Sequence, residues 1–336
     1  MEGFVSYLIT FGIFVAIWSI FALGLNVHWG YTGIFNFGIA GFFMVGAYTA
    51  AVLTKEPAAG GSYSQYIGGY ELPFYIGIIG AAVTAGLLAV LVGLPTLRLR
   101  SDYLAIATIG VAEALRRVAI NERDFVNGTR GMIGIPAPLE GIVSTRSDFY
   151  NLLYLGLAVV VLIIIYVAVE RGIRSPWGRV LRAMREDELT TAASGKNVTA
   201  FRMQAFVLGA MIMGVGGAMY AYHIRAIAPE TFEPLFGTFI IWAMLIVGGS
   251  GNNKGAILGA FVVWGIWSGT GLLAQRMPDA FEVRVFYFRL LLIGLLIVGV
   301  LLLRPNGILG EERRVSIFVE RETRREARKT RSGPPP

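Results

Sequence analysis

FVSYLITFGIFVAIWSIFALGLNV, residues 4–27, contains no charged side chain. It is long enough to cross a bilayer, because a helix needs about 20 apolar residues to span ~30 Å of hydrocarbon. Further apolar stretches follow at 33–53, 74–97, 103–120, 150–169, 203–222, 237–249, 255–274 and 285–303. Backbone groups in lipid must hydrogen-bond within the chain, and these runs lack the alternation of barrel strands. We therefore predict an all-α polytopic membrane protein, a bundle of about nine transmembrane helices, some of them discontinuous.

Composition agrees with this class and narrows the chemistry. Hydrophobic residues make up 55% of the 336 residues, and the mean hydropathy is +0.63. The first stretch follows no Lys or Arg and exceeds the core of a signal peptide, so we interpret it as a retained transmembrane helix. There is no cysteine, and we interpret His28 and His223, which lie far apart, as ordinary helix-end or interfacial residues. We expect no metal site, no catalytic residues and no bound cofactor.

Lys and Arg side chains gather at two places outside the apolar stretches. Seven lie between residues 171 and 202, and nine lie between residues 304 and 331. Basic residues are retained on the cytoplasmic side of short loops, and an even number of predicted helices separates the two places. We therefore expect a cell (inner or plasma) membrane protein with its N-terminus outside and its C-terminus in the cytoplasm. This bias explains the net charge of +7 better than nucleic-acid binding does.

The first of these places contains GRVLRAMREDELTTAASGKN, residues 178–197, which is much more polar than the rest of the chain. Read as a helix from Arg179 to Ser194, it forms one face from Arg182, Arg185, Glu186 and Leu189 and another from Met184, Glu188, Ala192 and Gly195. A connection between two spans needs only a few residues, and small residues beside charges suit docking against another protein. We predict a helix that projects from the cytoplasmic surface to bind a partner; the alternative is an ordinary solvated connection.

The segment R-x-x-R-E-D-E-L-T-T-A-A-S-G, residues 182–195, resembles the cytoplasmic coupling helix of importer permeases that work with ATP-binding cassette (ABC) subunits. Further stretches are similar to the LivM-type branched-chain amino acid permeases, in the same order. They are LGLNVHWGYTGIFNFGIAGFFMVGAYTAA at 23–51, GLPTLRLRSDYLAIATIGVAEALRRV at 93–118, NGTRGMIGIP at 127–136, LIVGGSGNNKGAILGAFV at 245–262 and LLLRPNGILG at 301–310. Two features depart from the family pattern: a longer tail after Gly310, and GIAG at 38–41 in place of a stretch containing histidine.

The resemblance implies a permease domain at 1–310, with a coupling loop at 171–202, and a basic, partly disordered cytoplasmic tail at 311–336. It also implies two ABC ATPase subunits, a second related permease of the LivH type, an extracytoplasmic solute-binding protein and surrounding membrane lipid as partners. ATP is then used by the partners, because GGSGNNKG at 248–255 lacks the G-K-[ST] of a phosphate loop. The residues implied in ATPase coupling are Arg182, Arg185, Glu186, Glu188, Ala192 and Gly195.

GYTGIFNFG, residues 30–38, interrupts an apolar zone with glycines and polar residues. Discontinuous helices of this kind form the binding regions of many transporters, although a plain interfacial turn is an equal alternative. We place Asn26, Thr32, Asn36, Phe37, Thr108 and Glu113 near a substrate path. Glu113 also has Arg116 and Arg117 at i+3 and i+4, and a structural ion pair is our first interpretation of it.

Small-residue pairs such as Gly251/Gly255, Gly255/Gly259 and Gly265/Gly269, with GVGG at 214–217, predict close helix packing within the chain. For the substrate, the resemblance favours branched-chain amino acids, with urea or short amides as the alternative. An ion-coupled secondary transporter would need more intramembrane ionisable groups, and a membrane-embedded enzyme would need a His, Cys or carboxylate cluster. Both are therefore weaker hypotheses.

Overall fold

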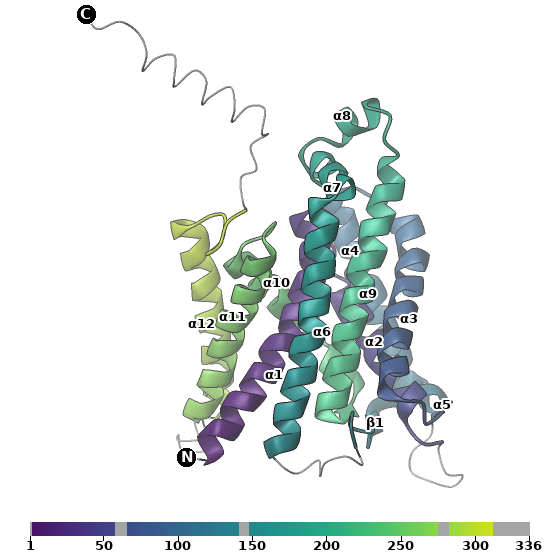
Figure 1. Ribbon diagram of the computed structural model, residues 1–336, viewed down its shortest axis with the longest axis vertical. Helices are drawn as coiled ribbons and strands as arrows, with labels where there is room; N and C mark the ends of the chain where they lie inside the picture. The colour runs from purple at the N-terminus through teal and green to yellow at the C-terminus, as the bar shows by residue number, and fades with distance from the viewer. Residues whose placement is uncertain (1, 58–65, 141–147, 275–281, 312–336) are drawn as a thin grey trace, which may run out of the picture.

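The computed structural model describes residues 2–57, 66–140, 148–274 and 282–311, and it is a bundle of helices (Figure 1). In this part of the chain, five helical stretches are long and apolar enough to cross a membrane. They are built from α1 (Glu2–Leu25) with the following turn, α3 (Phe74–Thr96), α6 (Asp148–Arg174), α9 (Val198–Ile224) and α11 (Asn253–Ala274). Shorter apolar stretches lie in α2 (Ile39–Thr54), in η4 (Leu235–Phe239) with α10 (Ile240–Gly248), and in α12 (Glu282–Leu303). The predicted multi-pass helical fold is confirmed.

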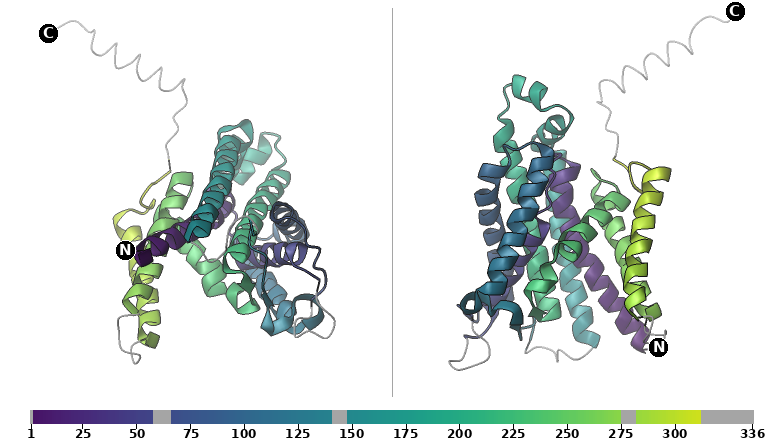
Figure 2. Two further views of the ribbon diagram at one scale, coloured as in Figure 1. Left: turned by 60° about the horizontal axis from the view of Figure 1, so that its bottom comes forward. Right: turned by 180° about the vertical axis from the view of Figure 1, so that it is seen from behind.

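The helix α4 (Ser101–Asn121) differs from its neighbours because it carries charges within a predicted span. It packs mainly on α2 and α3, on the side of the bundle away from α12. Seen from behind, the blue helices α3 and α4 lie on one side and the yellow-green α12 on the other, with α1 crossing obliquely between them (Figure 2).

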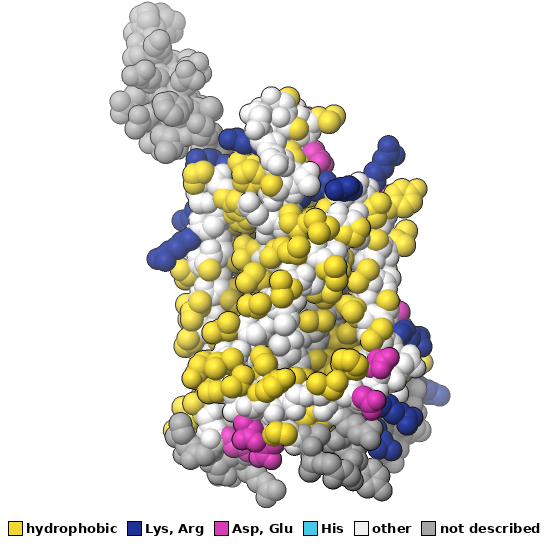
Figure 3. Space-filling model, turned by 90° about the vertical axis from the view of Figure 1, so that its right-hand side faces the viewer, with side chains coloured by type: hydrophobic (Ala, Val, Ile, Leu, Met, Phe, Trp, Pro, Cys, Tyr) yellow, Lys and Arg dark blue, Asp and Glu magenta, His cyan; other side chains and the backbone are white. Residues whose placement is uncertain are grey.

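The two ends of the bundle are different in character. At one end lie the N-terminus of α1, α5 (Arg123–Val126), η2 (Gly128–Arg130) and a short antiparallel pair of β1 (Met132–Ile133) with β2 (Ala226–Ile227). At the other end lie α7 (Pro176–Glu186), α8 (Glu188–Ala193) and the end of α12 (Figure 1). A broad apolar band separates charged side chains at the two ends (Figure 3), as expected for a protein whose middle lies in lipid.

The core forms where α2 and α3 pack against α9, and α1 against α6, α9 and α11. Glycine permits the closest of these crossings: a Cβ on Gly46 of α2 would lie 2.3 Å from the Gly214 carbonyl oxygen of α9. Likewise, a Cβ on Gly259 would lie 1.8 Å from the Met244 oxygen. The predicted packing of small residues within the chain is therefore present at these helices, whereas an added Cβ on Gly269 meets no described atom within 4 Å. The predictions for the tail at 312–336 lie outside the described residues.

Candidate coupling and translocation site

The chain breaks between the first two apolar stretches, where the sequence predicted a discontinuity. After α1 the backbone forms a π-helical turn, η1 (Asn26–Gly30), and then runs without regular structure from residue 33 to residue 38 before α2 begins. The second stretch therefore contributes only the 16-residue helix α2. We call residues 26–38 the unwound segment.

Side chains from distant helices satisfy the backbone groups that the unwound segment leaves unpaired. The Thr108 hydroxyl of α4 accepts a hydrogen bond from the Phe37 N–H at 3.0 Å. The indole N–H of Trp242 in α10 donates to the Asn36 carbonyl at 3.1 Å, and the Thr238 hydroxyl of η4 donates to the Phe37 carbonyl at 3.3 Å. Irregular backbone persists at membrane depth only when protein or water covers it, so these contacts explain how the break is tolerated.

Four of the polar residues predicted for the substrate path, Asn26, Thr32, Asn36 and Thr108, are buried inside the chain in this conformation. Asn26 is fully buried; its amide donates to the Asn253 side-chain oxygen at 3.0 Å, and its own oxygen accepts from the Gly251 N–H at 2.8 Å. Asn36 is also fully buried, and its side-chain oxygen accepts from the Gly38 N–H at 2.8 Å. Thr32 donates to the carbonyls of residues 27 and 28. These side chains therefore stabilise the conformation of the unwound segment.

His28 belongs to the same network: it lies in the last turn of η1, as the helix-end interpretation has it, but it is buried and not interfacial. Its ring is fully buried within η1, with Nε2 at 2.8 Å from the Phe206 carbonyl and Nδ1 at 3.1 Å from the Asn36 amide. Close packing against Gly209 explains the burial, because a Cβ on this glycine would lie 2.3 Å from Nε2. His28 thus ties the unwound segment to α9.

Phe37 differs from the other predicted path residues because it is half-buried. Its ring stacks on Trp242, with centroids 4.8 Å apart and planes at 15°, and it contacts Phe35 and Phe239 edge to face. Phe239 is 44% exposed, so this aromatic cluster reaches the surface of the chain. Through this cluster, the unwound segment contributes apolar surface to the outside of the chain.

Glu113 forms the predicted structural ion pair. Its carboxylate lies 2.7 Å from Arg116 Nε and 2.7 Å from Arg117 Nε, at i+3 and i+4 on α4. The charge is thus neutralised within one helix face. Glu113 does not join the buried network around Asn26 and Asn36.

The charged loop is two helices and not one, which corrects the predicted continuous helix from Arg179 to Ser194. Helix α7 ends at Glu186, and Asp187 adopts φ −154° and ψ 109° before α8 begins. The Asp187 carboxylate caps α8 by accepting from the Thr190 N–H at 3.0 Å and the Thr190 hydroxyl at 2.9 Å, which lowers the pKa of Asp187. The break removes Leu189 from the face of Arg182, Arg185 and Glu186 and leaves it 83% exposed.

Arg185 connects α7 to two distant parts of the chain. Its Nη1 donates to the Gly30 carbonyl at the end of η1, and its Nη2 lies 2.7 Å from Glu311 and 2.9 Å from Glu186. Burial opposes the charged form, but the hydrogen bonds to Glu311 and Glu186 outweigh it and raise the pKa of Arg185. The guanidinium therefore stays charged and joins α7, the unwound segment and the segment after α12.

The remaining predicted coupling residues lie around α8. Glu188 pairs with Arg202 of α9 at 3.2 Å, and Ala192 is exposed. Gly195 has φ +80°, a conformation that suits glycine just after a helix end, and no described atom lies within 4 Å of an added Cβ. This small, accessible surface is suited to close contact with another protein.

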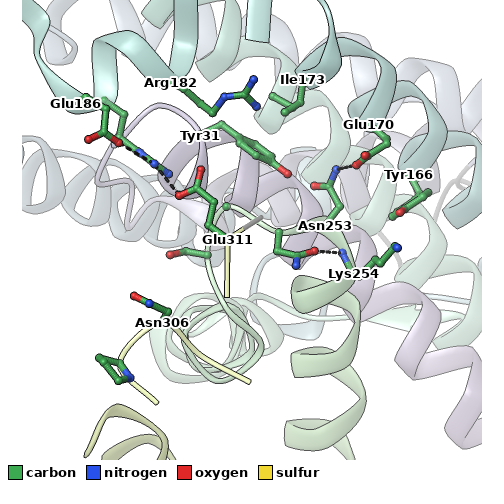
Figure 4. Close-up of a pocket in the computed structure, with 15 residues that line it drawn as sticks. Tyr31, Tyr166, Glu170, Ile173, Arg182, Glu186, Asn253, Lys254, Asn306 and Glu311 are labelled. Atoms are coloured by element: carbon green, nitrogen blue, oxygen red, sulfur yellow. Dashed lines mark hydrogen bonds and ion pairs between the residues drawn. The ribbon is translucent and has the colours of Figure 1, made fainter. Parts of the chain in front are cut away.

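A polar cavity of about 520 Å³ lies beneath α7 (Figure 4). Charged residues of both signs line it: Glu170, Arg182, Arg185, Glu186, Lys254 and Glu311. Tyr31 and Ile173 supply part of its apolar wall. Arg182, Arg185 and Glu186 line this cavity together, whereas Glu188, Ala192 and Gly195 lie outside its lining.

Sequence reasoning missed several residues of this site. Glu311, Gly251, Asn253 and Trp242 each contact the unwound segment or Arg185 from far along the chain. The run SGNN at 250–253 carried a turn signal, but no local pattern indicates its partner 225 residues away.

The sequence of the chain is similar to a known family and to several known proteins. Residues 7–301 match the model of a family described as "Branched-chain amino acid transport system / permease component". The chain is 30% identical, over 87% of its length and 68% of the relative, to the "High-affinity branched-chain amino acid transport system permease protein LivM" of Escherichia coli (strain K12).

Two further relatives are more distant. The "Probable branched-chain amino acid transport permease protein LivH" of Methanocaldococcus jannaschii is 25% identical over 86% of this chain and 87% of its own. The "Nucleoside ABC transporter permease protein NupC" of Lactococcus lactis subsp. cremoris is 24% identical over 75% and 77%. No solved structure matches the chain.

Proposed function

Because the chain belongs to the family of branched-chain amino acid transport system permease components, we propose that it is the permease subunit of an ATP-driven ABC importer for aliphatic, branched-chain amino acids. It binds no cofactor of its own in this proposal. Two separate ABC ATPase subunits use the ATP, a second, LivH-type permease completes the membrane part, and an extracytoplasmic binding protein delivers the substrate.

The observation that carries this proposal is the contact of Arg185 with the Gly30 carbonyl. It links the helix α7, which projects at one end of the bundle, to the end of η1 within the unwound segment. A displacement of α7 by an ATPase would pull on Gly30 and hence on residues 33–38, which form no regular secondary structure. Such a pull would act on the unwound segment and shift the equilibrium between two conformations of the transporter, which open the substrate path to opposite sides of the membrane.

In this mechanism, the accessible surface of α8 contributes to the contact with the ATPase. Glu188, Ala192 and Gly195 lie on the far side of the Asp187 break, and the pairing of Glu188 with Arg202 anchors α8 to α9. We assign α8 with the exposed face of α7 to the ATPase contact, and the buried face of α7 to transmission of the movement. The proposed orientation follows: the end of the bundle with α7 and α8 is cytoplasmic, and the end with β1 and β2 is outside.

The substrate assignment rests on the relatives. The E. coli and M. jannaschii relatives are named for branched-chain amino acids, whereas the Lactococcus relative is named for nucleosides. The closer identity to the amino acid permease supports the aliphatic amino acids over urea, amides or an ion-coupled secondary transporter.

The deciding experiment is uptake of labelled leucine and labelled urea into vesicles that contain the chain with its copurified partners and binding protein. We expect leucine uptake that requires ATP and persists when ion gradients are collapsed. Urea uptake without leucine uptake would overturn the substrate, and uptake driven by an ion gradient without ATP would overturn the importer assignment.

A further inference from the structure

The junction between α6 and α7 is closely packed. Ser175 is the single residue between the two helices, and its N–H and hydroxyl both donate to the Gly172 carbonyl, at 3.1 and 2.6 Å. On the other side of the junction, a Cβ on Gly178 of α7 would lie 2.2 Å from the Ile173 carbonyl oxygen of α6. A displacement of α7 therefore also moves the last turn of α6.

Glu170 lies one turn before the end of α6, and its carboxylate contacts two partners. Oε1 lies 2.6 Å from the Arg174 guanidinium at i+4, within the same helix. Oε2 accepts a hydrogen bond at 2.8 Å from the side-chain amide of Asn253, the first residue of α11 (Figure 4). Hydrogen bonds to a carboxylate are stronger than those between neutral groups. Glu170 therefore joins the end of α6 to the start of α11.

Asn253 continues this link to the unwound segment. Its side chain is 2% exposed, and its oxygen accepts from the Asn26 amide at 3.0 Å while its nitrogen donates to Glu170. A carboxylate only accepts hydrogen bonds, so the direction of both bonds is fixed: Asn26 donates to Asn253, and Asn253 donates to Glu170. An aspartate at position 253 could accept the first bond but, when ionised, could not donate the second.

The turn η1 is therefore held at both of its ends. Its first residue, Asn26, is linked through Asn253 to α6, and its last residue, Gly30, accepts from Arg185 of α7. Because the junction between α6 and α7 is closely packed, a displacement of α7 reaches both ends. A turn held at Gly30 alone would tilt about its other end, whereas a turn held at both ends moves as a unit.

We propose that Glu170 is a positioning residue of the transporter. Through Asn253 it sets the position of Asn26 and transmits the movement of α6 to the start of the unwound segment, in parallel with the contact of Arg185 and Gly30. Glu170 acts through Asn253 and not by contact with substrate or ATP. The inference rests on the proposed function, because it requires an ATPase that displaces α7.

The test measures the relative stimulation of ATP hydrolysis in the assembled transporter in proteoliposomes: the increase caused by loaded binding protein, divided by the rate without it. A loss of folded protein lowers both rates equally and leaves this quantity unchanged. Asn253→Asp places a second carboxylate against Glu170, and we expect the relative stimulation to fall at least fivefold. Unchanged relative stimulation in this variant would overturn the inference.

A second substitution should rescue this variant. When Glu170→Gln is added to Asn253→Asp, the glutamine amide can donate to the new carboxylate, which can still accept from Asn26. The direction of one hydrogen bond is reversed, but the link from Asn26 to α6 is restored. We expect the relative stimulation to return to within twofold of that of the unaltered transporter. A double variant no better than Asn253→Asp contradicts the proposed link.

Substitution of Glu170 alone tests the link from the side of α6 and does not require Asn253→Asp to fold. Glu170→Leu removes the acceptor for the Asn253 amide, and we expect the relative stimulation to fall at least fivefold. Glu170→Gln keeps an oxygen that can accept from this amide and should retain at least half of the stimulation. Equal stimulation in the leucine and glutamine variants would count against the role of Glu170.

Asn252 provides the control for a merely structural effect. Its side-chain oxygen accepts from two N–H groups in the first turn of α11, so Asn252→Ala should lower the melting temperature of the permease. Among the described residues, its hydrogen bonds reach neither Asn26 nor Glu170. We therefore expect its relative stimulation to be unchanged. A fall as large as that of Asn253→Asp would show that coupling follows the stability of this turn, against the proposal.

Uptake of labelled leucine by the unaltered transporter is measured in the same proteoliposomes. Absence of ATP-driven uptake would overturn the proposed function and remove the premise of this inference. If uptake occurs and the variants of Glu170 and Asn253 leave the relative stimulation unchanged, the inference fails while the proposed function stands.

Discussion

Arg185 and Gly30 are 155 residues apart in the chain, yet the Arg185 guanidinium donates a hydrogen bond to the Gly30 carbonyl. The same guanidinium pairs with Glu186 and Glu311. One side chain on the projecting helix α7 therefore contacts the point where the first transmembrane helix stops being regular. Through this contact, a displacement of α7 by the proposed ATPase would reach the part of the chain that lies in the membrane.

Replacement of Arg185 by alanine should uncouple ATP hydrolysis from transport. The change removes a charged hydrogen bond to Gly30 and two ion pairs, and hydrogen bonds to charged groups contribute about 1.5–3 kcal/mol each. We expect stimulation of ATPase activity by loaded binding protein to fall at least tenfold, with assembly of the complex retained. Arg98→Ala, an exposed arginine outside α7 and α8, is the control. Unchanged stimulation in R185A would contradict the proposed route.

Cysteine substitution should distinguish the two neighbours Asn36 and Phe37. The chain has no native cysteine, so each variant carries one thiol. Phe37 is half-buried in a cluster that reaches the surface, whereas Asn36 is fully buried and bonded to Gly38. We expect a hydrophilic thiol reagent to label Phe37→Cys and to leave Asn36→Cys unlabelled in the resting transporter. If neither cysteine is labelled from either side of the membrane, this segment does not line a water-accessible path.

The spans and the break were predictable because hydropathy and glycine-rich interruptions are local signals. The Glu113 pairing was also predictable, since i+3 and i+4 spacing defines it within one helix. The break between α7 and α8 was not predicted, because the helical periodicity of the sequence continues through Asp187. The sequence pattern therefore did not indicate that Asp187 caps α8 by accepting a hydrogen bond from the Thr190 N–H. The contact of Arg185 with Gly30 depends on tertiary packing alone, and no pattern in one sequence encodes it.

Orientation provides an independent prediction. If α7 and α8 are cytoplasmic, a single cysteine at Lys196 should react with an impermeant reagent only in inside-out vesicles. A single cysteine at Asp124, in α5 at the other end of the bundle, should react only in right-side-out vesicles. The reverse labelling pattern would invert the proposed topology and place the coupling surface on the wrong side for ATP.

Asn26 should be a structural determinant of the unwound segment. Asn26→Ala leaves the buried Gly251 N–H and the Asn253 side-chain oxygen without their partner, at a cost of about 1–3 kcal/mol for each unsatisfied group. We expect a lower melting temperature of the purified permease by several degrees, on the order of 2–4 °C per kcal/mol. The control is Asn121→Ala at an exposed position, which should change the melting temperature little. Equal effects of the two variants would argue against the buried network.

Matched glycine substitutions should separate close packing from open surface. Gly46 and Gly156 both lie within helices, but a Cβ on Gly46 would lie 2.3 Å from the backbone of Gly214, whereas Gly156 has no described atom within 4 Å. Gly46→Ala should force α2 away from α9 and destabilise the protein by about 1–3 kcal/mol. Gly156→Ala should be neutral or stabilising, because alanine favours the helix by up to about 1 kcal/mol. The measurement is the melting temperature of each variant in the same detergent. If Gly46→Ala melts no lower than Gly156→Ala, the crossing of α2 and α9 cannot be as close as the structure has it.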